Sequence, residues 1–69
     1  MSSPRLYKHV NNTDVAIEVI KSFYVKEKSL WKLKVRWYNI VHRPTSMGIV
    51  ETIKIPRAKW RDEWNLLDT

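Results

Sequence analysis

The sequence predicts a mainly β protein: a small, highly curved antiparallel sheet or barrel of four to five strands, with a short C-terminal helix as a further element. Two observations carry this prediction. The chain has only 69 residues, which leaves room for one domain. Three segments alternate apolar and polar side chains and are rich in β-branched and aromatic residues, as half-buried strands are. These segments are residues 15–25, 30–41 and 49–55.

The clearest strand is the segment 30–41, because apolar and basic side chains alternate without interruption over residues 31–37. Successive side chains of a β-strand point to opposite faces, so one face of this strand is apolar and the other is basic. The apolar face takes Trp31, Leu33, Val35 and Trp37, and the basic face takes Lys32, Lys34 and Arg36. We expect the apolar face to line the hydrophobic core.

Residues 15–25 form the second expected strand, with Phe23 on its apolar side and Tyr24 on its outer side. Lys21 interrupts the apolar side. Such a break in parity is typical of a β-bulge or a sharp bend, which small barrels use to curl. We therefore expect a bulge or a sharp bend near Ile20 and Lys21.

Turn residues mark the connections between these strands. Residues 26–29 form the expected hairpin tip, and because they contain no glycine we predict a four-residue loop around a type I turn. Pro44 and Gly48 predict a loop over residues 42–48. Pro56 ends the third strand, because proline cannot donate a hydrogen bond to a β-ladder.

The third strand, residues 49–55, has Ile53 and Ile55 on its apolar face and Lys54 on the other face. Glu51 falls on the apolar face. A carboxylate is costly to bury without a partner. We therefore expect Glu51 at a sheet edge or facing a lysine.

The C-terminal segment is open to two predictions. Trp60, Trp64 and Leu67 recur at helical spacing, and Pro56 suits the first position of a helix. The alternative is a single turn followed by a short closing strand through Trp64 and Leu66. At the other end, residues 1–5 are expected to be a frayed terminus, and residues 6–69 to form the domain, which begins with a short strand.

The formal net charge is +6, from 13 Lys and Arg against 7 Asp and Glu. A basic balance favours a polyanionic partner such as nucleic acid, an acidic protein or a membrane surface. The chain has no cysteine, which excludes disulfides and thiolate metal sites. No apolar run approaches the roughly 20 residues of a membrane span, and residues 1–5 do not begin a secretory signal. We expect a cytoplasmic protein that does not act in a membrane.

The hairpin made by residues 15–21 and 31–37 resembles the first hairpin of a chromodomain, whose second strand typically ends in a Val-Lys-Trp-like run. Here that run is Val35-Arg36-Trp37. Chromodomains and Tudor domains belong to the small Src-homology-3-like barrels. The resemblance covers this hairpin alone and implies a small barrel fold.

Catalytic chemistry has little support in the sequence. The chain contains no glycine-rich phosphate loop and no Ser-His-Asp grouping in a recognisable context. His9 and His42 lie far apart and lack the clustered carboxylates of a metal site, so we expect them to be loop or edge histidines. Asp62 and Glu63 are adjacent and would point apart on a helix. We expect no enzymatic activity, no metal and no cofactor.

The basic row of the strand 30–41 is the candidate binding site. Side chains on one strand face repeat about every 7 Å, which is close to the distance between successive phosphates on one nucleic-acid strand. Tyr38 shares this face and has two interpretations: it stacks a base, or it covers an edge of the core with its hydroxyl in water. Lys59 and Arg61 add positive charge nearby. The expected nucleic-acid-binding residues are Lys32, Lys34, Arg36, Tyr38, Lys54 and Arg57. The alternative is that these lysines only solubilise an exposed strand.

Three functions remain open. The first is a largely sequence-independent nucleic-acid binder, of DNA or RNA. The second is a small accessory or inhibitory protein, of the kind that viruses encode, which docks an acidic surface of a partner protein. The third is a structural homo-oligomer formed through an exposed strand edge or through the Trp60–Trp64 segment. The tryptophans discriminate between them, because exposure within an apolar patch favours a protein interface. We expect at least three of the four tryptophans to pack in the core.

Overall fold

The computed structural model describes residues 5–67, in which the chain forms one antiparallel sheet. Its strands are β1 (Leu6–His9), β2 (Val15–Val25), β3 (Leu30–Asn39), β4 (Thr45–Pro56) and β5 (Trp64–Leu66). A helix, α1 (Arg57–Glu63), precedes β5, and a 3₁₀ turn, η1 (Lys26–Lys28), joins β2 to β3. The predicted mainly β fold, with its antiparallel sheet and short C-terminal helix, is confirmed. The frayed terminus expected over residues 1–5 lies outside the described residues, apart from the exposed Arg5.

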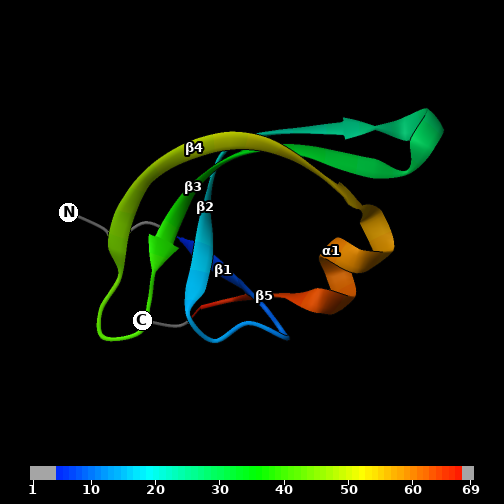
Figure 1. The fold of residues 1–69 in the computed structure, drawn as a ribbon. Coiled ribbons are helices and arrows are strands. Elements are labelled where there is room, and N and C mark those ends of the chain that lie inside the picture. Colours follow the sequence, from blue (N-terminus) through cyan, green and yellow to red (C-terminus); the bar gives the residue numbers. More distant parts are fainter. Residues whose placement is uncertain (1–4, 68–69) are drawn as a thin grey trace.

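The strand order in the sheet is β4-β3-β2-β1-β5. β4 and β5 are therefore the two edges, and the sheet of the described residues does not close into a barrel. Figure 1 shows the long strands arching over α1. The sheet thus has an inner, concave side that faces α1 and an outer, convex side.

The main hydrophobic cluster lies on the concave side, whereas the buried Leu6 and Ala16 lie on the opposite face, in register with Glu18 and Tyr38. The buried centre of the main cluster consists of Ile17, Leu33, Val35 and Ile55. All four tryptophans are half-buried, and each packs against this centre. The prediction that at least three tryptophans belong to the core is confirmed.

The bulge expected in β2 is present, and its consequence corrects the predicted faces of that strand. The pairing between β2 and β3 shifts register between Val19 and Lys21, and Ile20 is exposed. One extra residue exchanges the two faces of all that follows it. Phe23 therefore lies on the convex side and Tyr24 on the concave side, so the predicted placement of both residues was wrong.

Two residues with positive φ shape the connections. Ser29 (φ 49°) follows η1, so residues 26–29 form the predicted four-residue hairpin tip. Gly48 (φ 74°) lies within β4, where the pairing with β3 shifts register. Glycine adopts this conformation at little cost. β4 therefore begins at Thr45 and includes part of the loop predicted over residues 42–48.

The C-terminal segment realises both of its alternatives in succession. Helix α1 ends at Glu63, and β5 then pairs antiparallel with β1. The ring centroid of Trp60 lies 4.9 Å from that of Tyr7 and 5.9 Å from that of Trp64. Pro56 is the last residue of β4 and immediately precedes α1. It was predicted to be the first residue of the helix, which instead begins at Arg57. These contacts hold α1 and β5 against the concave side of the sheet.

Candidate nucleic-acid interface

Three rows of side chains cross the convex side from β2 through β3 to β4. In the pairing register they are Phe23, Lys32 and Lys54; then Lys21, Lys34 and Thr52; then Glu18, Arg36 and Val50. Residues in one row lie on neighbouring strands about 5 Å apart, and successive rows lie about 7 Å apart. The four lysines in the first two rows are all exposed. We call Lys21, Lys32, Lys34 and Lys54 the outer lysine patch.

The predicted residues Arg36 and Tyr38 lie on the same side as the patch but are engaged by one carboxylate. Arg36 Nη1 donates to Glu18 Oε1 at 3.1 Å, and the hydroxyl of Tyr38 donates to the same oxygen at 3.1 Å. The guanidinium charge is therefore compensated, and the tyrosine ring is half-buried. The positive surface is consequently concentrated on the four lysines, towards the hairpin tip.

The basic residues after Pro56 do not join the rows of the sheet. Arg57 begins α1, and its backbone N–H donates to the carbonyl of Ser29 at 2.9 Å. Arg61 Nε donates to Asp62 Oδ1 at 2.9 Å; this hydrogen bond lowers the pKa of the Asp62 carboxyl and raises the pKa of Arg61. Arg57 is thus exposed next to the hairpin, and Arg61 is compensated within α1.

Two residues of this face were missed by the sequence reasoning, Lys21 and Phe23. Both lie after the bulge, where the parity of β2 is reversed. The signal was present at the hairpin tip, because a four-residue loop pairs Val25 with Leu30. Counting back from that pair places Phe23 opposite Lys32.

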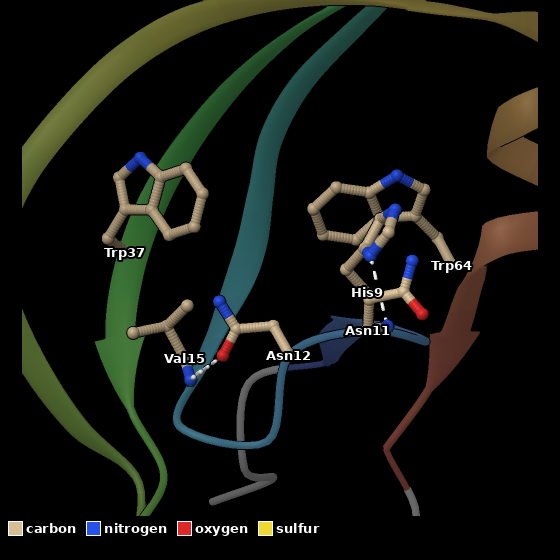
Figure 2. Close-up of a pocket in the computed structure, with 6 residues that line it drawn as sticks. All are labelled: His9, Asn11, Asn12, Val15, Trp37 and Trp64. Carbon is tan, nitrogen blue, oxygen red and sulfur yellow. Dashed lines mark hydrogen bonds between the residues drawn. The ribbon is translucent and has the colours of Figure 1, made fainter.

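The concave side contains a cavity of about 340 Å³ beside the turn that joins β1 to β2. It is lined by His9, Asn11, Asn12, Val15, Trp37 and Trp64. Figure 2 shows the two indoles on opposite sides of this cavity. Trp37 Nε1 donates to Glu51 Oε1 at 2.8 Å. Glu51 thus lies on an edge strand, as predicted, but its partner is an indole and not a lysine.

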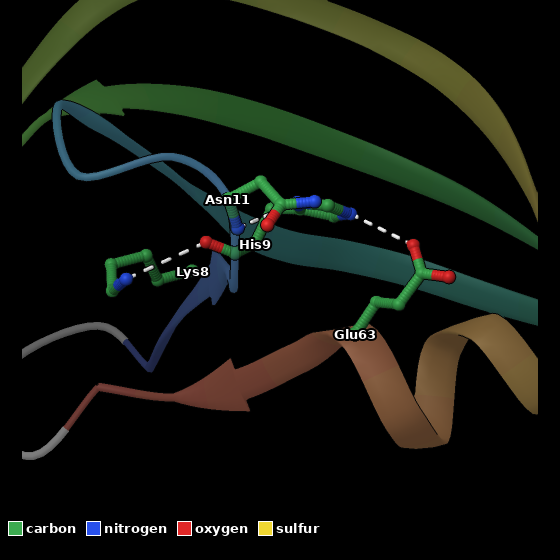
Figure 3. Close-up of polar contacts among 4 residues, drawn as sticks. All are labelled: Lys8, His9, Asn11 and Glu63. Atoms are coloured by element: carbon green, nitrogen blue, oxygen red, sulfur yellow. Dashed lines mark hydrogen bonds and ion pairs between the residues drawn. The ribbon is translucent and has the colours of Figure 1, made fainter.

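His9, which lines this cavity, is hydrogen-bonded through both ring nitrogens (Figure 3). The backbone N–H of Asn11 donates to His9 Nδ1 at 3.1 Å, which leaves His9 Nε2 as the nitrogen that donates to Glu63 Oε1, at 2.9 Å. Asn12 Oδ1 accepts the backbone N–H groups of Asp14 and Val15. The bond between His9 and Glu63 ties β1 to α1, and the Asn12 bonds hold the turn after β1, so we assign both a structural role.

Within residues 5–67 no group of three or more His, Cys, Asp or Glu side chains is placed to hold a metal ion. In the same part of the chain, no helix has the length and apolar character needed to cross a membrane. Comparisons with protein-family models, with curated proteins and with solved structures found no match to this chain.

Proposed function

We propose that this protein is a non-enzymatic nucleic-acid binder that grips phosphates with the outer lysine patch. The observation that carries the proposal is the placement of four exposed lysines in two adjacent rows. In the described residues none of the four forms an ion pair with a carboxylate. An acid neighbour comes only in the third row, where Glu18 holds Arg36.

The cross-strand pairing of the patch argues for a ligand and against simple solubility. Lys32 lies directly opposite Lys54, and Lys21 lies directly opposite Lys34. Like charges opposite one another in a sheet are destabilising. Isolated lysines at alternate positions would keep the strand soluble without this cost. The attraction between the lysines and a bound polyanion would offset the repulsion between the paired lysines.

The shape of the site favours contacts to the backbone of a nucleic acid. The lysines stand on a sheet surface and not on a helix or a narrow ribbon that fits a DNA groove. Phosphate contacts position a nucleic acid without reporting its sequence. The binding is therefore proposed to be largely independent of sequence.

The test is binding of labelled random oligonucleotides, single- and double-stranded, between about 50 and 200 mM salt. If the four lysines each neutralise one phosphate, affinity should fall about 50-fold on single strands (log–log slope about −2.8) and about 150-fold on duplex (slope about −3.6). An absence of binding at the lowest salt would reject the proposal.

A second candidate function, docking on a partner protein, is favoured by a different observation. Several large apolar side chains are exposed at or beside the edge strand β4: Val41, Met47, Ile49 and Val50. An open strand edge with apolar side chains is suited to pairing with another chain. If no oligonucleotide binds, a pull-down with this protein as bait tests for a partner protein with an acidic surface. Sedimentation tests whether the protein associates with itself.

A further inference from the structure

Phe23 is the most exposed large hydrophobic residue among those that the structure describes, with 66% of its surface accessible. It lies within β2 and not in a loop. The bulge at Ile20 turns it away from the core and places it opposite Lys32 on the convex side. An aromatic ring is therefore presented to solvent at one corner of the outer lysine patch.

The Phe23 ring does not pack in the hydrophobic core. On the concave side the neighbouring Tyr24 packs against Trp31, with ring centroids 4.9 Å apart, and this pair covers the hairpin end of the core. The buried centre of the core also excludes Phe23. Because Phe23 is exposed, it forgoes the favourable free energy that burial of a phenylalanine side chain contributes.

We propose that the ligand of the outer lysine patch is single-stranded nucleic acid, and that Phe23 stacks one of its unpaired bases. This inference rests on the proposed function. A ring beside a row of ammonium groups reproduces the two elements of single-strand binding, an aromatic platform and positive charge along the backbone. Lys32 in the same row and Lys21 in the next row are placed to hold the phosphates that flank the stacked base.

A duplex would not use Phe23 in this way. Its bases are stacked on one another, so no base face is available to a ring on a sheet surface. The duplex would contact the lysines alone. The contribution of Phe23 should therefore depend on the strandedness of the probe, whereas the contribution of the lysines should not.

The experiment compares Phe23→Ala, Phe23→Leu and Phe23→Tyr for binding to a labelled oligothymidylate of about 12 nucleotides, which forms no internal pairs. A random-sequence duplex hairpin is the second probe. Phe23→Ala and Phe23→Leu should each weaken binding to the oligothymidylate about tenfold, and Phe23→Tyr should retain it, because stacking needs an aromatic face. Since no charge is removed, the salt slope should stay unchanged. Duplex binding should change less than twofold.

The leucine variant is the matched control, because it keeps an exposed apolar side chain without a π-face. Binding of Phe23→Leu equal to that of the unmodified protein would overturn the inference, and so would equal losses on the two probes. Those results leave the proposed function standing if the salt slope is steep. An unmodified protein that binds neither probe would instead reject the proposed function itself.

Discussion

Replacing Leu33 by alanine is expected to lower the free energy of unfolding by about 2–5 kcal/mol. The side chain is 2% exposed and lies at the centre of the core, between Ile17, Val35 and Ile55. Truncation leaves a cavity that the rigid sheet cannot fill. A domain of 69 residues has a small stability margin. Urea unfolding followed by tryptophan fluorescence should therefore show a much lower midpoint or an already unfolded protein.

The control is Lys34→Ala, the next residue along β3, whose side chain is exposed on the convex side. Surface substitutions of this kind change stability by about 0.5 kcal/mol or less. The substitution also removes the repulsion between Lys34 and Lys21, which should raise the free energy of unfolding slightly. A Leu33→Ala protein as stable as the Lys34→Ala protein would show that the two faces of β3 are reversed.

Replacing Lys32 and Lys34 together by alanine is expected to weaken oligonucleotide binding at least tenfold while leaving the fold intact. Both side chains are exposed, and together they form half of the outer lysine patch. The log–log salt slope on single strands should fall in magnitude by about 1.4, which corresponds to two lost phosphate contacts. Fluorescence anisotropy at several salt concentrations measures both quantities.

The matched control removes the same charge elsewhere. Arg43 lies in the loop before β4, Lys59 lies on α1, and both are exposed. The double variant Arg43→Ala/Lys59→Ala should retain most of the affinity and the full salt slope. Equal losses from the two double variants would show that net charge alone drives binding, and the patch would lose its assignment as the site.

The alternation over residues 31–37 predicted both faces of β3, because a strand buried on one side alone leaves a complete period-2 pattern in its sequence. The buried Leu33 and Val35 and the exposed Lys32 and Lys34 follow that pattern. The β3 lysines of the candidate site were therefore visible before the fold was known, whereas Lys21 of β2 was not.

The residues that lie opposite β3 on the neighbouring strands could not be predicted from the same pattern. The interruption at Lys21 indicated a bulge, but its effect on Phe23 depends on the register between two strands, which the hairpin tip sets. The bond network of Glu18 with Arg36 and Tyr38 depends on the same register. A pattern within one strand carries no information about which residue lies opposite.

The positive φ of Gly48 explains the misplaced start of β4. Glycine is typical of loops, yet the same freedom lets it sit in a bulge within a strand. The C-terminal segment differs again: its tryptophan spacing fits a helix, but the pairing of β5 with β1 is a tertiary contact. Local periodicity alone does not predict where such a helix ends.

The most direct test of the central claim is to titrate oligothymidylate into ¹⁵N-labelled protein and follow the backbone amide signals by NMR. The claim predicts that the largest shifts fall on β2, β3 and β4 at the outer lysine patch and at Phe23. Shifts confined to the cavity between Trp37 and Trp64, or to the exposed edge of β4, would contradict it.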